Sequence, residues 1–500
     1  MTEEDVANQE PGSGESPSSI TEEGSIQSGK LAGKSMWAAI WILSLPVLLQ
    51  QTLAAFVGLV DKVFGGSMPD AIVIPALDGL SVGSFIGWLI SIALSGLGIG
   101  AQALIARAIG AGDVPLAQRA LGSALTIAVI WGCLVGVGLW FLIEPLCRFV
   151  ELEAEATRFA RDYVQILAFS MPFCSLMMVS SMCLHAAGET TWPAVIGVFA
   201  NIVNMVGSWI FSGVELQFGE MVIPNPSPID PMIWGVQGIA LGTASAWLFG
   251  AIASVLLLLR GVRDLQLNPK DLRPDGDLSW RIVRIGVPTF FEGMAMWMAN
   301  FVIMRFIGDI AVRSTDQTGE AAGLQGAHII AIQWESFSFL PGFAMGTAAG
   351  ALAGQYLGAG NPRLARKAML SCTYVAMVIM STLGVVFMTL GEPLTRVISD
   401  QPVHLAEVPP LLFICGAAQI FFAITMVIRQ GLRGVGDTRW TLFLTVISSY
   451  GIRLPIAWWL GVHLGYGLSG IWIGLCGEIV IRAGLFFARF LQGGWARVTV

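Results

Sequence analysis

The chain of 500 residues alternates long apolar runs with short polar segments. Each run has the roughly 20 residues that an α-helix needs to cross about 30 Å of hydrocarbon. Inside lipid the backbone must satisfy its own hydrogen bonds, which favours helices over irregular segments. The twelve runs cover residues 36–60, 72–100, 120–143, 162–184, 193–213, 234–259, 281–306, 326–350, 368–390, 408–430, 440–462 and 466–491. The pattern therefore predicts an all-α integral membrane protein with twelve transmembrane helices.

The segments between the runs show that the chain is duplicated. "IGAGDVPLAQRA" at residue 109 returns as "LGAGNPRLARKA" at residue 357, and "LHAAGETTW" (184–192) returns as "LRGVGDTRW" (432–440), both at an offset of 248 residues. Later the offset falls to 232, because the first half has a longer, Pro-rich loop at 219–234. Six helices is an even number, so both halves have the same orientation. We predict two six-helix bundles related by a parallel pseudo-twofold axis along the membrane normal, an architecture typical of transporters.

The duplication sets the domain boundaries. We expect an N-lobe at 36–260, a charged cytoplasmic linker at 261–280, a C-lobe at 281–491 and a short cytoplasmic C-terminus at 492–500. The segment 1–35 is rich in Ser, Gly and Pro, and its first 29 residues hold seven acids and no base. This composition predicts a disordered acidic tail. The net charge of −7 comes from that tail, because the remaining acids and bases balance.

The distribution of lysine and arginine predicts the orientation. If the N-terminus is cytoplasmic, 18 of the 27 basic residues fall in cytoplasmic segments, with Arg429 and Arg433 counted among them, and seven fall on the opposite side. Basic residues are enriched in cytoplasmic loops. Both termini and both Gly-Ala-Gly turns are therefore predicted on the cytoplasmic side of the cell membrane.

Four motifs resemble those of the multidrug and toxic compound extrusion (MATE) transporters, and the third is similar to the bacterial NorM-like branch. In chain order they are "SLPVLLQQTLAAFVGLVD", "GAQALIARAIGAGD", "ESFSFLPGFAMGTAAGALAGQYLGAGNP" and "LRGVGDTRW". The resemblance extends from about residue 36 to residue 491. It implies twelve helices in two lobes and a secondary active exporter that exchanges cationic, amphipathic compounds for Na⁺ or H⁺.

The resemblance also implies an ion-coupling site in the N-lobe. Asp61 matches the acid that the family has in its first span, and Asn204 and Thr243 match polar residues of the fifth and sixth spans. Their oxygens suit a hard cation such as Na⁺. Ser208 stands where many relatives have a second acid, so the site has a single carboxylate and H⁺ stays open as the coupling ion. Lys62 departs from the family pattern beside Asp61.

Two further acids are candidate ion-coupling residues. An ionisable group inside a span costs about 2.5–3.5 kcal/mol on insertion scales, so each one suggests a function. Glu292 takes the position that Gln50 has in the first half, four residues after a proline. Glu335 matches an acid of the NorM-like motif. Neutralising such a carboxylate with Na⁺ or H⁺ would compete with a cationic substrate.

Substrate binding is assigned to residues around the same positions. Aromatic rings and methionines suit flat or cationic compounds through cation–π contacts and adaptable packing. The candidate substrate-binding residues are Gln50, Glu292, Met296 and Trp297. Three other charged residues, Glu478, Arg482 and Arg453, instead predict a structural ion-pair network in the C-lobe.

The predicted function is multidrug export by alternating access. We expect small organic cations as substrates, the lipid bilayer as surroundings, a monomer, no nucleic-acid partner, no resident metal and no cofactor other than the coupling ion. The sequence has no HExxH motif and no P-loop, and we expect no enzyme activity. The alternative is a lipid-linked oligosaccharide flippase, which should have many basic residues for pyrophosphate, whereas few are expected in these spans. A membrane enzyme or receptor would need a catalytic cluster or a large extramembrane domain.

Overall fold

The structure, a computed structural model, describes residues 33–69, 71–149, 154–218, 221–273, 275–318 and 323–498. Most of the expected acidic tail lies outside the described residues. Within them, twelve helical segments are long and apolar enough to cross a membrane, so the twelve predicted spans are confirmed. Those of the N-lobe are α1 (Met36–Gly66), α2 (Val73–Gly110), α3 (Val114–Phe149), α4 (Ala154–Ala186), α5 (Thr191–Ser212) and α6 (Pro231–Arg260).

The C-lobe has the same number of spans, with one that changes its helical form. The regular spans are α7 (Gly276–Thr318), α8 (Leu324–Gly358), α9 (Pro362–Thr389), α11 (Pro402–Gly434) and α14 (Gly467–Gln492). The remaining span consists of α12 (Thr438–Ser448), the π-helical η2 (Ser449–Arg453), α13 (Leu454–Ala457) and the π-helical η3 (Trp458–His463). Such π-helical turns are often found at functional sites.

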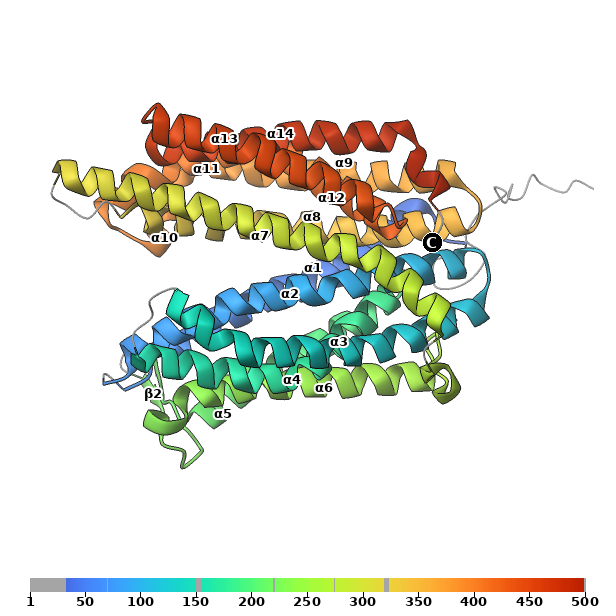
Figure 1. Ribbon diagram of the computed structural model, residues 1–500, viewed down its shortest axis with the longest axis horizontal. Helices are drawn as coiled ribbons and strands as arrows, with labels where there is room; N and C mark the ends of the chain where they lie inside the picture. The colour runs from blue at the N-terminus through green and yellow to red at the C-terminus, as the bar shows by residue number, and fades with distance from the viewer. Residues whose placement is uncertain are drawn as a thin grey trace, which may run out of the picture.

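Two helical bundles make up the molecule, α1–α6 in blue to green and α7–α14 in yellow to red (Figure 1). Each lobe inserts the start of its first helix into the core of the other. Ile40 of α1 packs in the C-lobe core, and Ile282 of α7 packs in the N-lobe core. Large apolar side chains such as Phe141 and Phe169 are exposed on the bundle surfaces, as expected for contact with lipid.

The duplicated turns have the same backbone structure. Gly112 and Gly360 have φ values of 76° and 77°, a left-handed conformation that glycine adopts without a Cβ clash. In both turns the residue that follows this glycine donates its backbone N–H to a carbonyl oxygen five residues earlier: Asp113 to Ala108 and Asn361 to Tyr356, each at 2.9 Å. The turns predicted from the 248-residue offset are therefore equivalent in three dimensions.

The same offset relates the contacts between α2 and α8, which meet across the two lobes. A Cβ atom at Gly110 would collide with the carbonyl oxygen of Gln355, and a Cβ atom at Gly358 would collide with the carbonyl oxygen of Arg107. Residues 110 and 358, and residues 107 and 355, are each 248 apart. The pseudo-twofold axis therefore passes between these helices. We call this end of the molecule, which carries the turns of Gly112 and Gly360, the turn end.

Several short elements were not predicted. A hairpin of β1 (Leu216–Phe218) and β2 (Met221–Ile223) lies between α5 and the Pro-rich part of the loop, and we call this end of the molecule the hairpin end. A short helix, α10 (Gly391–Ile398), follows α9. The expected C-terminal segment contains a 3₁₀ turn, η4 (Gly494–Arg497), whose Trp495 is buried and stacks on Phe490. The two bundles diverge towards the hairpin end (Figure 1).

The expected linker 261–280 is packed against the N-lobe. It contains a 3₁₀ turn, η1 (Pro269–Leu272), and its last five residues already belong to α7. Thr126 of α3 donates to the carbonyl oxygen of Leu272 at 2.8 Å, and Arg119 pairs with Asp275 at 3.1 Å. These contacts attach the connection between the lobes to α3.

Candidate functional site

Asp61 lies near the hairpin end of α1, and one of its oxygens has no partner. The side chain is partly buried, and its Oδ1 is fully buried without a hydrogen bond to any residue that the structure describes. A buried acceptor without a partner costs free energy that a cation or a proton would recover. The side chain of the neighbouring Lys62 lies outside the described part of the structure.

Asn204 and Thr243 are brought together, as the resemblance implied. The amide of Asn204 on α5 donates to Thr243 Oγ1 on α6 at 2.9 Å, and Thr243 in turn donates to the carbonyl of Ile239 at 3.3 Å. These bonds direct the carbonyl oxygen of Asn204 away from Thr243. That oxygen, Oδ1, is also buried, and in the described part of the chain nothing donates to it.

Tyr163 of α4 joins this group, although no pattern in the sequence predicted it. Its hydroxyl interacts with the Thr243 side chain, and it lies within electrostatic range of Asp61. Ser208 is buried and donates to the carbonyl of Ile239 at 3.3 Å, so it packs α5 onto α6. A tyrosine in an apolar run looks like a packing residue, and only the folded bundle places it beside the acid.

The donor set suits either coupling ion. Oxygens from a carboxylate, an amide and hydroxyls are the ligands that a hard cation prefers, and a single carboxylate also accepts one proton. Among the described residues, no group of three or more His, Cys, Asp or Glu side chains is arranged so that it could hold a metal ion. The geometry thus fits a transported Na⁺ or H⁺ and provides one negative charge for it.

Glu292 of α7 is fully enclosed by partners in the C-lobe. Its Oε2 accepts from Thr441 at 2.9 Å and pairs with Arg433 at 2.8 Å, while its Oε1 accepts from Thr445 at 2.8 Å. Arg429 approaches Oε1 at 3.7 Å. The carboxylate that the sequence assigned to ion coupling and substrate binding is therefore already bonded to two hydroxyls and a guanidinium.

The predicted network around Glu478 is confirmed. Glu478 Oε1 pairs with Arg482, and Oε2 pairs with Arg453 at 3.0 Å. Arg482 also donates to Ser448 at 2.9 Å and to Ser449 at 2.8 Å, where α12 passes into its π-helical turn. The change of helical form supplies two hydroxyls to one buried guanidinium.

The placement of Arg429 and Arg433 corrects the topology count. Both were counted as basic residues of a cytoplasmic segment, yet both lie in α11 with side chains only 13% and 12% exposed, next to Glu292. With Arg453 and Arg482 they give the C-lobe interior four arginines. The expectation that the spans hold few basic residues was therefore wrong, because a residue near the end of a run can point inward as well as outward.

The other candidate residues are dispersed. Glu335 of α8 has its Oε1 at 4.0 Å from the Cys415 thiol, a contact separate from Glu292. Gln50 of α1 packs against Gly197 of α5. Met296 lies in the arginine group, with its sulfur 3.2 Å from Arg429, whereas Trp297 stacks on Phe301. The predicted substrate residues thus do not form one cluster.

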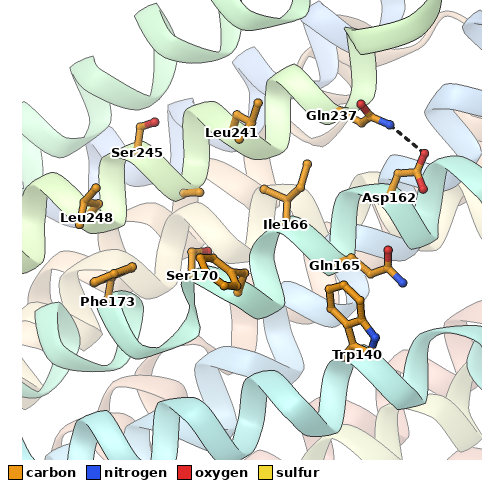
Figure 2. Close-up of a pocket in the computed structure, with 12 residues that line it drawn as sticks. Trp140, Asp162, Gln165, Ile166, Ser170, Phe173, Gln237, Leu241, Ser245 and Leu248 are labelled. Atoms are coloured by element: carbon orange, nitrogen blue, oxygen red, sulfur yellow. Dashed lines mark hydrogen bonds between the residues drawn. The ribbon is translucent and has the colours of Figure 1, made fainter.

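A groove of about 570 Å³ runs along the N-lobe, lined by residues of α3, α4 and α6 (Figure 2). Asp162 accepts from Gln237 at 2.9 Å at one end of it. Towards the other end lie apolar side chains such as Phe173 and Leu248. All of its lining residues come from one lobe, so the groove is not a passage between the lobes.

Comparison with known proteins places these features in a family. The MatE family profile matches residues 46–210 and 288–459. A probable multidrug resistance protein NorM of Thermotoga maritima is 28% identical over 92% of this chain and 93% of its own. A protein of Shewanella oneidensis named FAD transporter is 26% identical over 87% of this chain and 92% of its own. A solved structure, described as the outward-facing conformation of a multidrug resistance MATE family transporter of the MOP superfamily, covers 93% of this chain and 98% of its own, with a TM-score of 0.79 at 20% identity.

Proposed function

The chain belongs to the MatE family of multi-pass membrane transporters, and from that premise we propose that it exports cationic, amphipathic compounds in exchange for Na⁺ or H⁺. The observation that carries the proposal is the pair of buried, unpartnered oxygens, Asp61 Oδ1 and Asn204 Oδ1, recorded among the described residues. Both are acceptors that a cation would satisfy. The names of the relatives include both multidrug resistance proteins and an FAD transporter, so family membership leaves the substrate open.

Competition between the substrate cation and Na⁺ or H⁺ for Asp61 would couple export of the substrate to entry of the ion. Na⁺ or H⁺ neutralises the carboxylate and removes its attraction for a substrate cation. When the ion leaves, the carboxylate becomes charged again, and a buried charge attracts a cation more strongly than an exposed one because screening is weaker. Asn204 and Thr243, which are hydrogen-bonded to each other, and Tyr163, which lies within electrostatic range of Asp61, would supply the other oxygens of the site.

Alternating access requires the turn end and the hairpin end to open alternately. In the present conformation α2 and α8 are in contact at the turn end, while the bundles diverge towards the hairpin end (Figure 1). Following the distribution of basic residues, we assign the turn end and both termini to the cytoplasmic side of the cell membrane. Export would then separate α2 from α8 to admit the substrate.

Dye efflux from proteoliposomes tests this function. The vesicles contain a cationic rhodamine methyl ester, and inward Na⁺ and H⁺ gradients are applied separately. Efflux should accelerate under at least one gradient, and Asp61→Asn should abolish the acceleration. The control Asp309→Asn removes a carboxylate from a more exposed pair with Arg305 and should leave efflux intact. Acceleration under neither gradient would refute the proposed function.

A further inference from the structure

The interior of the C-lobe has more guanidinium groups than carboxylates to pair with them. Four arginines, Arg429, Arg433, Arg453 and Arg482, face two fully buried glutamates, Glu292 and Glu478. The third acid, Glu335, contacts the Cys415 thiol and lies within electrostatic range of Arg453, so three carboxylates face the four arginines. A guanidinium inside a protein stays charged, because its ordinary pKa lies far above neutral pH. The uneven pairing therefore leaves positive charge in the lobe.

That surplus charge is located at Arg429. Arg433, Arg453 and Arg482 each have a nitrogen within 3.0 Å of a carboxylate oxygen. Arg429 reaches Glu292 only at 3.7 Å, and its Nη1 donates to the thioether of Met296 at 3.2 Å. Its Nε is buried and, among the described residues, has no partner.

Glu292 is already committed to its other partners. Thr441, Thr445 and Arg433 occupy its two oxygens at 2.8–2.9 Å. Improving its contact with Arg429 would break one of these shorter bonds. A thioether is a weak acceptor and carries no charge, so Met296 does not replace a carboxylate.

A guanidinium with a free edge has a defined ligand chemistry. Its N–H groups form a planar fork that matches the two oxygens of a carboxylate or phosphate. A buried charge without a partner is strongly unfavourable, so an oxyanion that pairs with it would lower the free energy of the site. The Arg429 side chain as a whole is 13% exposed, although its Nε is buried.

We propose that Arg429 binds an oxyanion group, carboxylate or phosphate, of the transported compound. The preferred substrates are then amphiphiles that carry an acidic group in addition to a cationic one. This inference rests on the proposed export function and specifies its substrate class. Glu292 and Arg433 act as positioning residues that hold the guanidinium, and Met296 contributes an adaptable apolar wall.

A pair of matched dyes tests the proposal on the purified, full-length protein. One is a rhodamine with a free carboxylate, and the other is its methyl ester, which has the same ring system and one negative charge fewer. Binding is measured by fluorescence anisotropy in detergent. The wild type should bind the acid more tightly than the ester. Arg429→Gln should weaken binding of the acid by about tenfold or more and leave the ester within about twofold, as expected for loss of a charge-assisted hydrogen bond.

Two further variants make the result decisive. Arg429→Lys keeps the charge but loses the fork, so it should weaken acid binding severalfold and spare the ester; this variant decides the question if the glutamine variant does not fold. Arg396→Gln removes an exposed arginine that pairs with Glu392, and it should change the affinity for neither dye. The proposal is overturned if Arg429→Gln weakens binding of both dyes equally, or if it does not weaken binding of the acid. Dye binding without gradient-driven transport would refute the export function alone.

Discussion

Arg107 of the N-lobe donates a hydrogen bond to the carbonyl oxygen of Val435 in the C-lobe at 2.8 Å. The counterpart of Arg107, Gln355, donates in the opposite direction to Ala186 at 2.6 Å. Arg107 also donates to the carbonyl of Val498, in the C-terminal segment. These reciprocal bonds join the lobes at the turn end and have to break if that end opens.

Adding a methyl group where α2 packs against α8 at the turn end should hold the two lobes apart. Gly110→Ala places a Cβ against the Gln355 carbonyl, whereas the control Gly138→Ala on α3 meets nothing within 4 Å. The lobes should separate at the turn end in the first variant only. Spin labels at the symmetry-related, exposed positions 115 and 363 measure the distance, in a background of Cys133→Ser. An unchanged distance between the spin labels in Gly110→Ala would show that the α2–α8 contact does not hold the turn end closed.

Removing the acid from the Glu478 network should destabilise the protein. Glu478→Gln leaves Arg453 and Arg482 buried without their carboxylate, and breaking a buried ion pair in this way costs about 3–5 kcal/mol. Denaturant unfolding in detergent measures the free energy of unfolding. The matched variant Glu392→Gln breaks an exposed pair and should have little effect. Similar small changes in both variants would mean that the network does not stabilise the C-lobe.

The hydroxyl of Tyr163 should tune the ion site without being essential for folding. Tyr163→Phe removes the group that interacts with Thr243 near Asp61. If this polar interaction is worth about 1 kcal/mol, its loss should raise the half-saturating concentration of the coupling ion about fivefold. Transport rates at varied ion concentration give this value, and Tyr374→Phe, at an exposed position of α9, serves as the control. Identical ion dependence in the Tyr163 variant and wild type would exclude the residue from the site.

The sequence predicted what depends on long patterns. Twelve apolar runs give twelve spans because lipid leaves the backbone few alternatives to a helix. The 248-residue offset predicted equivalent turns at Gly112 and Gly360. Asn204 and Thr243, which the resemblance assigned to one site, are hydrogen-bonded to each other. The spans and the turns are repeated or local patterns, so they can be read without knowledge of the packing.

The features that the sequence did not reveal depend on side-chain direction. Arg429 and Arg433 lie close to the end of a run, where an arginine can reach the membrane surface or turn inward, and the fold decides between the two. Glu292 resembled a free cavity acid because its partners Thr441 and Thr445 lie about 150 residues further along the chain. Tyr163 became a site residue only when α4 was packed beside α6.

The most direct test of the account is the ion movement that a substrate gradient drives. Proteoliposomes with an outward gradient of the cationic rhodamine ester, and no initial Na⁺ or pH gradient, are monitored with trapped Na⁺- and pH-sensitive dyes. Wild-type protein should take up one of the two ions as the ester leaves, and Asp61→Asn should move neither ion. Ion uptake by Asp61→Asn equal to that of the wild type would contradict the assignment of coupling to this carboxylate.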